Sequence, residues 1–191
     1  MTVSLRSIAP RSHRHTLALS VCSFIAFLTL APALCGQVVI VDDRDPDCQL
    51  SGVWADNRSN GFSAAGTYKD GYHYTSSHAP FKRTGKEKAV YSPNLPKAGS
   101  YKVEVSFRAS SSNRSSKVTY QVMHKGGKTS KVVNQKDGND MTWAALGTFE
   151  FDAGQAPCVA MVSDGGQSAS VDAARFTFTA GGGNTGSLGD L

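Results

Sequence analysis

Aromatic side chains gather in one glycine- and serine-rich stretch of the chain, residues 61–77. It contains Tyr68, Tyr72 and Tyr74, and Trp54 precedes it. Tyr and Trp rings combine an apolar face with a polar edge, which suits them to stack on the C–H faces of sugars. In a strand, Tyr72 and Tyr74 would point to the same side, because side chains alternate with a period of two. These four residues are the candidate ligand-binding residues, and packing in the core is the competing fate of each ring.

A run of acidic residues near the start of the chain offers the oxygen ligands that hard cations such as Ca²⁺ prefer. Asp43, Asp45 and Asp47 have the spacing with which a calcium-binding loop begins. The rest of the loop pattern is missing, because Cys48 stands where glycine is needed and Trp54 where the closing glutamate belongs. We expect no cofactor, with calcium at these three aspartates as the alternative. A solvated turn whose Asp side chains bind nearby backbone is the simpler interpretation.

One histidine and one aspartate raise the question of catalysis. His124 ends an alternating run, and Asp172 shares its parity with the apolar residues that follow it. A catalytic triad would need a nucleophilic serine beside them, and the chain has no GxSxG or SxxK motif. We expect structural roles: His124 donates a hydrogen bond to a buried acceptor, and Asp172 accepts backbone N–H bonds or pairs with Arg175 or His124, since an unpaired buried charge is costly. Trp143 is expected to pack.

The N-terminus has the features of a targeting segment. Arginines form a positive leader, an almost uninterrupted apolar run covers residues 16–34, and small residues follow. The pattern predicts a signal peptide over residues 1–36, cleaved near Cys35 or the next residue, and so a secreted or cell-envelope protein. A membrane-spanning helix is the alternative, which Pro32 and the lack of a following basic stop signal disfavour. Lipidation at Cys35 is a second alternative, disfavoured by the bulky Leu34 before it.

Removing the leader changes the charge and the cysteine count. Three of the 20 basic residues lie in it, which leaves 17 basic against 15 acidic residues and gives no indication of nucleic-acid binding. No membrane contact is expected after the leader is removed. Cys48 and Cys158 remain, and each begins or precedes a strand-like run. Because exported proteins fold in an oxidising compartment, we expect a Cys48–Cys158 disulfide that staples neighbouring strands.

The rest of the chain is patterned as short strands. Apolar and polar residues alternate over 101–108 and 118–124, the period of a strand with one face on a core and the other in solvent. Turn-forming clusters separate the short runs, and no segment beyond the leader has helical periodicity. The pattern predicts an all-β, antiparallel β-sandwich of the jelly-roll, galactose-binding-like type, with one domain over residues 37–179 and a disordered glycine-rich tail over 180–191. The predicted strands are 38–41, 49–54, 72–75, 88–91, 101–108, 117–124, 130–134, 146–151, 159–162 and 170–178.

Six pieces of the sequence occur in the order found in a known family. They are VVIVDDRDPD, LSGVW, KAVYSPNLPKAGSYKVEVSFRASSSNR, VTYQVMHKGG, WAALGTFEFDAG and SVDAARF, and they lie within residues 38–178. Together they resemble the golvesin C-terminal-like domain, also described as a xanthan-lyase carbohydrate-binding-like domain. The resemblance implies a β-sandwich accessory module of exported bacterial proteins, to which attachment to polysaccharide is ascribed. It also implies a structural role for His124, which belongs to the pattern of a module without known catalysis.

These observations together favour an exported, non-catalytic module that attaches to polysaccharide or cell-envelope glycan. A structural or adhesive protein that contacts other proteins and has no sugar site is the alternative, since a fold does not decide function. A small hydrolase is a third. It is disfavoured because Glu87, Glu104 and Glu150 show no spacing typical of paired catalytic carboxylates, and the first two are expected on solvent-facing strand positions.

Overall fold

The computed structural model of the chain describes residues 36–60, 66–78, 82–138, 141–163 and 166–180. The predicted signal peptide, apart from Gly36, and the predicted tail after Ala180 lie outside these residues. Within the described ranges, no helix combines the length and the apolar character that crossing a membrane requires.

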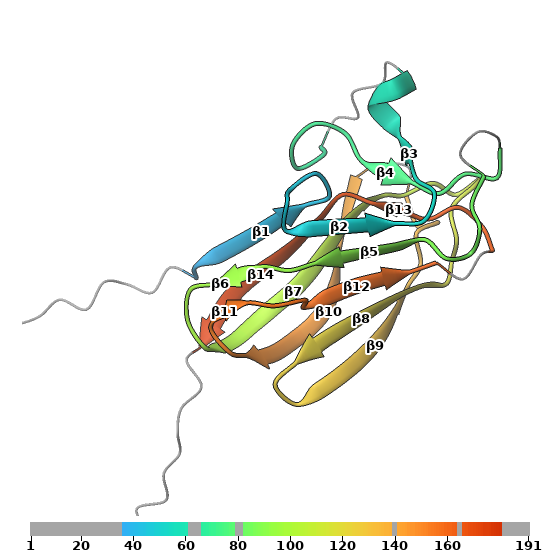
Figure 1. Cartoon of the computed structure of the whole chain (residues 1–191). Coiled ribbons are helices and arrows are strands. Elements are labelled where there is room, and N and C mark those ends of the chain that lie inside the picture. The colour runs from blue at the N-terminus through green and yellow to red at the C-terminus, as the bar shows by residue number, and fades with distance from the viewer. Residues whose placement is uncertain (1–35, 61–65, 79–81, 139–140, 164–165, 181–191) are drawn as a thin grey trace, which may run out of the picture. The chain divides into compact units, whose positions relative to one another are not determined.

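Two antiparallel sheets form the body of the domain (Figure 1). The first has, in spatial order, β1 (Val38–Asp42), β14 (Ala173–Ala180), β7 (Gly99–Arg108) and β10 (Met141–Phe151). The second has β2 (Cys48–Ser51), β5 (Lys88–Tyr91), β12 (Val159–Val162), β8 (Val118–His124) and β9 (Gly127–Val133). All neighbouring strands are antiparallel, so the predicted all-β sandwich is confirmed.

Short elements complete the ends of the sandwich. A small sheet has the order β13 (Ser170–Val171), β4 (His73–Tyr74) and β3 (Ala55–Asp56), and the 3₁₀ helix η1 (Asn57–Asn60) follows β3. Strands β6 (Asn94–Leu95) and β11 (Gly154–Gln155) form a separate two-stranded sheet. We call the end at which β7 finishes and β8 begins, to the right in Figure 1, the loop end.

The core lies where the apolar faces of the two sheets meet, and one cluster of buried residues draws on both. On β7, alternate residues from Tyr101 to Phe107 are at most 1% exposed, and on β8 alternate residues from Val118 to Val122 are at most 3% exposed. The alternation seen in the sequence therefore identifies the inward faces correctly. Aromatic rings close one end of this core: the Tyr101 ring meets the Phe178 ring edge-on at a centroid distance of 5.2 Å.

Two residues expected to face solvent are buried instead. Glu104 is 8% exposed because β7 is an interior strand whose outer face is covered by long side chains, and Arg175 of β14 binds its carboxylate. Glu87 is 0% exposed, and its carboxylate accepts hydrogen bonds from the Thr84 hydroxyl at 2.9 Å and the Gly85 N–H at 3.0 Å. Glu104 lies on the second face of its strand, and alternation does not show what covers that face. Glu87 shares the parity of the buried Ala89 and Tyr91, and the expectation of a solvent position took its charge as the deciding feature.

The predicted disulfide is wrong. Cys48 and Cys158 are free thiols. Cys48 pairs with Tyr91 from the β2 side, whereas the Cys158 N–H donates to the Tyr91 carbonyl from the β12 side at 2.9 Å. Strand β5 thus separates the two cysteines by two interstrand spacings, about 9–10 Å. A disulfide needs Cα atoms within roughly 7 Å, so these side chains cannot be bridged.

Candidate functional site

Tyr72 and Tyr74 lie side by side at the loop end. Tyr74 is the last residue of β4 and Tyr72 precedes that strand, so their side chains share a face, as the sequence predicts. Their ring centroids are 5.9 Å apart, with an angle of 50° between the planes. His73, between them, points the other way: its backbone N–H and its Nδ1 each lie 2.8 Å from Oδ2 of the buried Asp43. This anchor fixes the strand, and with it the two rings.

A buried arginine completes the ring pair, and the sequence analysis did not single it out. Arg114 is only 5% exposed, and its guanidinium carbon lies 5.8 Å from the Tyr72 centroid and 5.4 Å from the Tyr74 centroid. These are cation–π distances. Its Nε donates to the Arg108 carbonyl at 3.1 Å, and its Nη1 donates to the Ser168 hydroxyl at 2.6 Å. Burial lowers the pKa of Arg114, because desolvation disfavours the charged form.

The loop that carries Arg114 is held by its neighbours at the loop end. It connects β7 to β8, and the Ser115 N–H donates to the Ser168 carbonyl at 2.7 Å. At its base, the Ser110 N–H donates to the Gln135 carbonyl and the Gln135 N–H donates to the Ser115 carbonyl, both at 3.0 Å. The Gln135 amide is buried and in turn binds Ser170 of β13. Because these bonds join the loop to two other segments of the chain, Arg114 sits on a firmly held loop.

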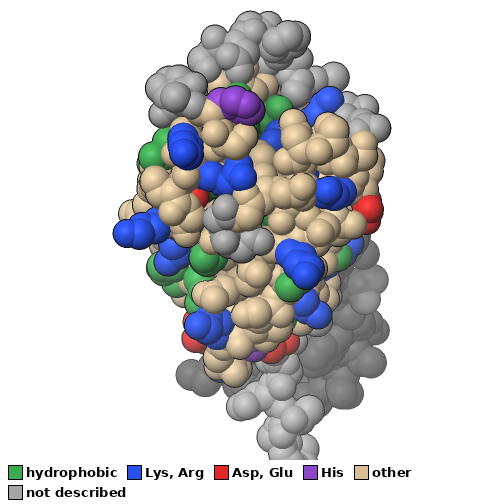
Figure 2. All heavy atoms as spheres, turned by 90° about the vertical axis from the view of Figure 1, so that its right-hand side faces the viewer, with side chains coloured by type: hydrophobic (Ala, Val, Ile, Leu, Met, Phe, Trp, Pro, Cys, Tyr) green, Lys and Arg blue, Asp and Glu red, His purple; other side chains and the backbone are tan. Residues whose placement is uncertain are grey.

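Two hollows open beside Arg114, and both include Asn113 and Arg114 in their walls. One, of about 400 Å³, is also lined by Tyr74, His78, Arg83, Gln167 and Ser168, among others. The other, of about 250 Å³, is also lined by Tyr72, Arg108 and Ser110. Figure 2 views the loop end directly: Lys and Arg side chains are spread over this face, and acidic side chains lie mostly toward its margins. We call the two hollows with Tyr72, Tyr74 and Arg114 the loop-end site.

The other two aromatic candidates do not line these hollows. The Trp54 indole N–H donates to the Ser51 carbonyl at 2.8 Å, and its ring packs against the core. Tyr68 is 43% exposed, and its backbone N–H donates to the Asp172 carboxylate at 3.3 Å. Of the predicted aromatic set, the structure thus brings together only Tyr72 and Tyr74.

The structural residues predicted from the sequence have well-defined partners. His124 Nδ1 accepts a hydrogen bond from the Gly126 N–H at 3.1 Å, so Nε2 carries the proton in the neutral ring and donates to the Thr129 hydroxyl at 3.0 Å. Its ring lies over Phe149 with centroids 4.9 Å apart. These contacts support the structural role expected for His124, although the ring is half-buried rather than part of the core.

Asp172 is fully buried, and its carboxylate accepts a backbone N–H bond from Tyr68, which was one of the two kinds of partner expected for it; the alternative, a pairing with Arg175 or His124, is wrong. It accepts a 2.6 Å hydrogen bond from the Ser106 hydroxyl besides the one from Tyr68, and neither Arg175 nor His124 binds it. Arg175 instead binds Glu104 through Nε at 3.0 Å and Nη2 at 2.8 Å, with its guanidinium 4.2 Å from the Trp143 centroid. Burial raises the pKa of Asp172 to about 6.

The aspartates considered for calcium bind separate groups. Asp43 holds His73, the Asp45 carboxylate binds Lys69, and Asp47 accepts from the Gln155 amide at 2.5 Å. Oδ2 of Asp42 and Oδ1 of Asp43 are buried without hydrogen-bond partners, and burial raises the pKa of Asp42. Among the described residues, no group of three or more His, Cys, Asp or Glu side chains is arranged to hold a metal ion. The calcium hypothesis therefore stays a prediction.

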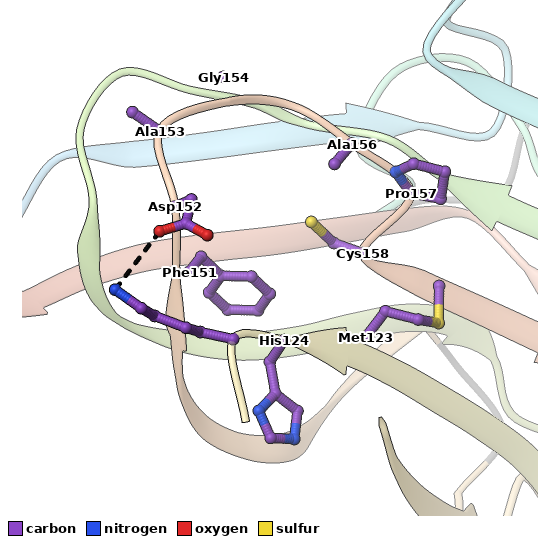
Figure 3. Close-up of a pocket in the computed structure, with 10 residues that line it drawn as sticks. Met123, His124, Phe151, Asp152, Ala153, Gly154, Ala156, Pro157 and Cys158 are labelled. Atoms are coloured by element: carbon purple, nitrogen blue, oxygen red, sulfur yellow. Dashed lines mark ion pairs between the residues drawn. The ribbon is translucent and has the colours of Figure 1, made fainter. Parts of the chain in front are cut away.

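A third hollow, of about 240 Å³, lies at the opposite end of the sandwich, where β8 and β10 finish (Figure 3). Phe151, Met123 and Pro157 form much of its wall, and the exposed Lys125 and Asp152 face each other at 3.5 Å beside it. Figure 3 shows the His124 imidazole pointing away from Phe151 and the ion pair. The described lining of this third hollow contains neither a pair of tyrosine rings nor a buried cation, both of which the loop-end site has.

Comparisons with known proteins agree with this architecture. Xanthan lyase of Bacillus sp. (strain GL1) is 34% identical over 126 residues, which is 66% of this chain and 13% of the lyase. The structure of Paenibacillus xanthan lyase superimposes with a TM-score of 0.64 at 27% identity, covering 75% of this chain and 13% of that one. The chain thus spans about an eighth of the length of these two xanthan lyases.

A solved module of similar length shares the fold. The CBM35 from Cellvibrio japonicus Abf62 matches with a TM-score of 0.50 at 10% identity, over 76% of this chain and 94% of that one. A family model described as the Golvesin C-terminal domain matches residues 39–180. That range covers nearly the whole described sandwich, and it confirms the resemblance seen in the order of six sequence motifs. The chain belongs to the Golvesin C-terminal domain family.

Proposed function

We propose that this protein is an exported, non-catalytic module that attaches to polysaccharide through the loop-end site. The observation that carries the proposal is the fixed pair of Tyr72 and Tyr74 rings beside two hollows. Stacking on aromatic rings supplies most of the contact that a sugar makes, and a few polar groups set its orientation. Asn113 and Gln167 in the hollow walls offer amide donors and acceptors for that purpose.

The family and the fold support this assignment. A segment of xanthan lyase is similar in sequence to this chain, and the sandwich resembles a module named for carbohydrate binding. Because the match covers 13% of the lyase, the lyase reaction is not part of the proposal. The predicted signal peptide would place the module outside the cell, where polysaccharides are available.

Retention on immobilised polysaccharides tests the proposal. Purified protein is screened against an array of bacterial and plant polysaccharides, and Tyr72→Ala and Tyr74→Ala are compared with Tyr68→Ala. Tyr68 is a matched control, because it is an exposed tyrosine outside the two hollows. We expect binding of at least one polysaccharide that both site variants lose and the control keeps, with unchanged circular dichroism.

Two results would contradict the proposal. Wild-type protein that binds no polysaccharide but captures a protein partner would favour the adhesive alternative. Polysaccharide binding that survives both site substitutions, or that Tyr68→Ala abolishes, would move the site elsewhere on the sandwich.

A further inference from the structure

The cation at the centre of the loop-end site has no counter-ion among the residues that the structure describes. Arg114 contacts a carbonyl, a hydroxyl and two aromatic rings, and none of the described carboxylates lies within ion-pair distance of it. Burying a charge costs several kcal/mol unless an opposite charge or a full set of hydrogen bonds compensates. The guanidinium has five N–H donors, and its hydrogen bonds to the Arg108 carbonyl, the Ser168 hydroxyl and the Tyr72 side chain use only part of them.

The surroundings of Arg114 carry the same sign of charge. The described residues that line the two hollows include Arg83, Arg108 and His78 and contain no Asp or Glu. Arg83 and Arg108 also engage other groups of the chain, and their charges add to the positive field at the site. Charge of one sign in a concave site attracts ligands of the opposite sign.

From these observations we infer that the glycan bound at the loop-end site is acidic, with a sugar carboxylate placed against Arg114. The inference rests on the proposed function and adds the substrate class to it. A planar guanidinium pairs with a carboxylate through two parallel N–H···O bonds, which fixes orientation as well as affinity. Tyr72 and Tyr74 would then stack on the ring of the acidic sugar or of its neighbour. A sulfate ester offers similar charge, so the experiment separates the two anions.

Binding to three polymers tests the inference on the wild-type protein. Polygalacturonate presents carboxylates, its fully methyl-esterified form has the same backbone without the charge, and dextran sulfate presents sulfates on neutral sugars. We expect polygalacturonate to bind at least roughly tenfold more tightly than the esterified polymer, because charge-assisted hydrogen bonds are lost with the ester. We also expect this preference to shrink as salt rises from 50 to 500 mM.

Two variants locate the effect. Arg114→Gln removes the charge and keeps an amide, and Arg114→Lys keeps the charge but loses the two-bond geometry. Lys125→Gln is the matched control, because it removes one positive charge from the opposite end of the sandwich. We expect Arg114→Gln to abolish the preference for polygalacturonate, Arg114→Lys to weaken it, and Lys125→Gln to leave it unchanged. If Arg114→Gln fails to fold, the polymer comparison on wild-type protein still decides.

The outcomes separate this inference from the proposed function. Equal binding of charged and esterified polymer, or loss of preference in Lys125→Gln, overturns the inference and leaves polysaccharide attachment standing. Tighter binding of dextran sulfate than of polygalacturonate overturns the assignment to carboxylates. Failure to bind any polysaccharide on the wider array overturns both.

Discussion

Replacing Gln135 with methionine should destabilise the domain strongly, although no charge is lost. The Gln135 side chain is 0% exposed. Its Nε2 donates to the Ser170 carbonyl at 2.9 Å, and its Oε1 accepts from the Ser170 N–H at 2.9 Å. Nε2 also lies 3.3 Å from the Tyr120 hydroxyl. Methionine fills much the same volume but supplies no such donor or acceptor, so the buried N–H and carbonyl of Ser170 lose these partners.

The magnitude follows from the groups left unpaired. Each buried polar group without a partner costs about 1–3 kcal/mol, so the two groups of Ser170 predict that Gln135→Met lowers the free energy of unfolding by about 2–6 kcal/mol. Urea denaturation followed by tryptophan fluorescence measures this value, and an unchanged slope against urea shows that the unfolded state is not altered. Since Gln135 also forms hydrogen bonds with the loop that carries Arg114, glycan binding should weaken in Gln135→Met even where this variant is folded.

The neighbouring residue provides the control. Asn134 is exposed, and its amide binds the Asp137 carboxylate at 2.9 Å on the surface. Asn134→Ala should therefore change the free energy of unfolding by no more than about 0.5 kcal/mol. A loss below about 1 kcal/mol in Gln135→Met, or equal losses in the two variants, would refute the view that this amide holds the loop end together.

Three further predictions concern Asp172, the two cysteines and the acidic turn. The pKa of Asp172 is raised to about 6 from 3.8, so the folded state binds the proton more tightly than the unfolded state does. The stability that the protonated carboxyl contributes is therefore present below about pH 4 and is lost as the pH rises through 6. Between pH 4 and 7 the free energy of unfolding of the wild-type protein should fall by about 2–3 kcal/mol from this one group, and Asp172→Asn should remove that fall. Asp172→Ala should lower the melting temperature. Burial raises the pKa of Cys158 to about 12 and also raises the pKa of Cys48. Neither thiol should therefore be alkylated by iodoacetamide at pH 8 before the protein unfolds. Mass spectrometry that finds the two cysteines disulfide-linked would contradict the structure. Calcium at 1 mM should leave the melting temperature unchanged, and a rise of several degrees would show that the acidic turn holds the ion.

Local alternation of apolar and polar residues determined much of the fold. The inward faces of β7 and β8 follow directly from their sequences, because a period of two allows only two faces and the apolar one must be buried. The same rule placed Tyr72 and Tyr74 on one side of His73. It said nothing about what covers the second face, and so Glu104 was assigned to solvent.

The site itself depends on contacts between distant parts of the chain. Arg114 reaches Tyr72 and Tyr74 from a loop about forty residues further on, and only the packing of that loop on Gln135 and Ser168 brings them together. Nothing in the neighbouring sequence of Arg114 distinguishes it from an exposed arginine. The cysteines illustrate the same limit: each was correctly placed beside a strand, but the order of strands puts β5 between them.

The amino-acid sequence alone therefore determined the class of fold, the inward faces of its strands and the family, since these depend on short-range pattern and motif order. Tertiary structure alone decided which side chains share the loop-end site and which thiols stay apart. The physical reason is that strand order and loop packing are set by the burial of the whole core, to which every strand contributes, and no local segment carries that information.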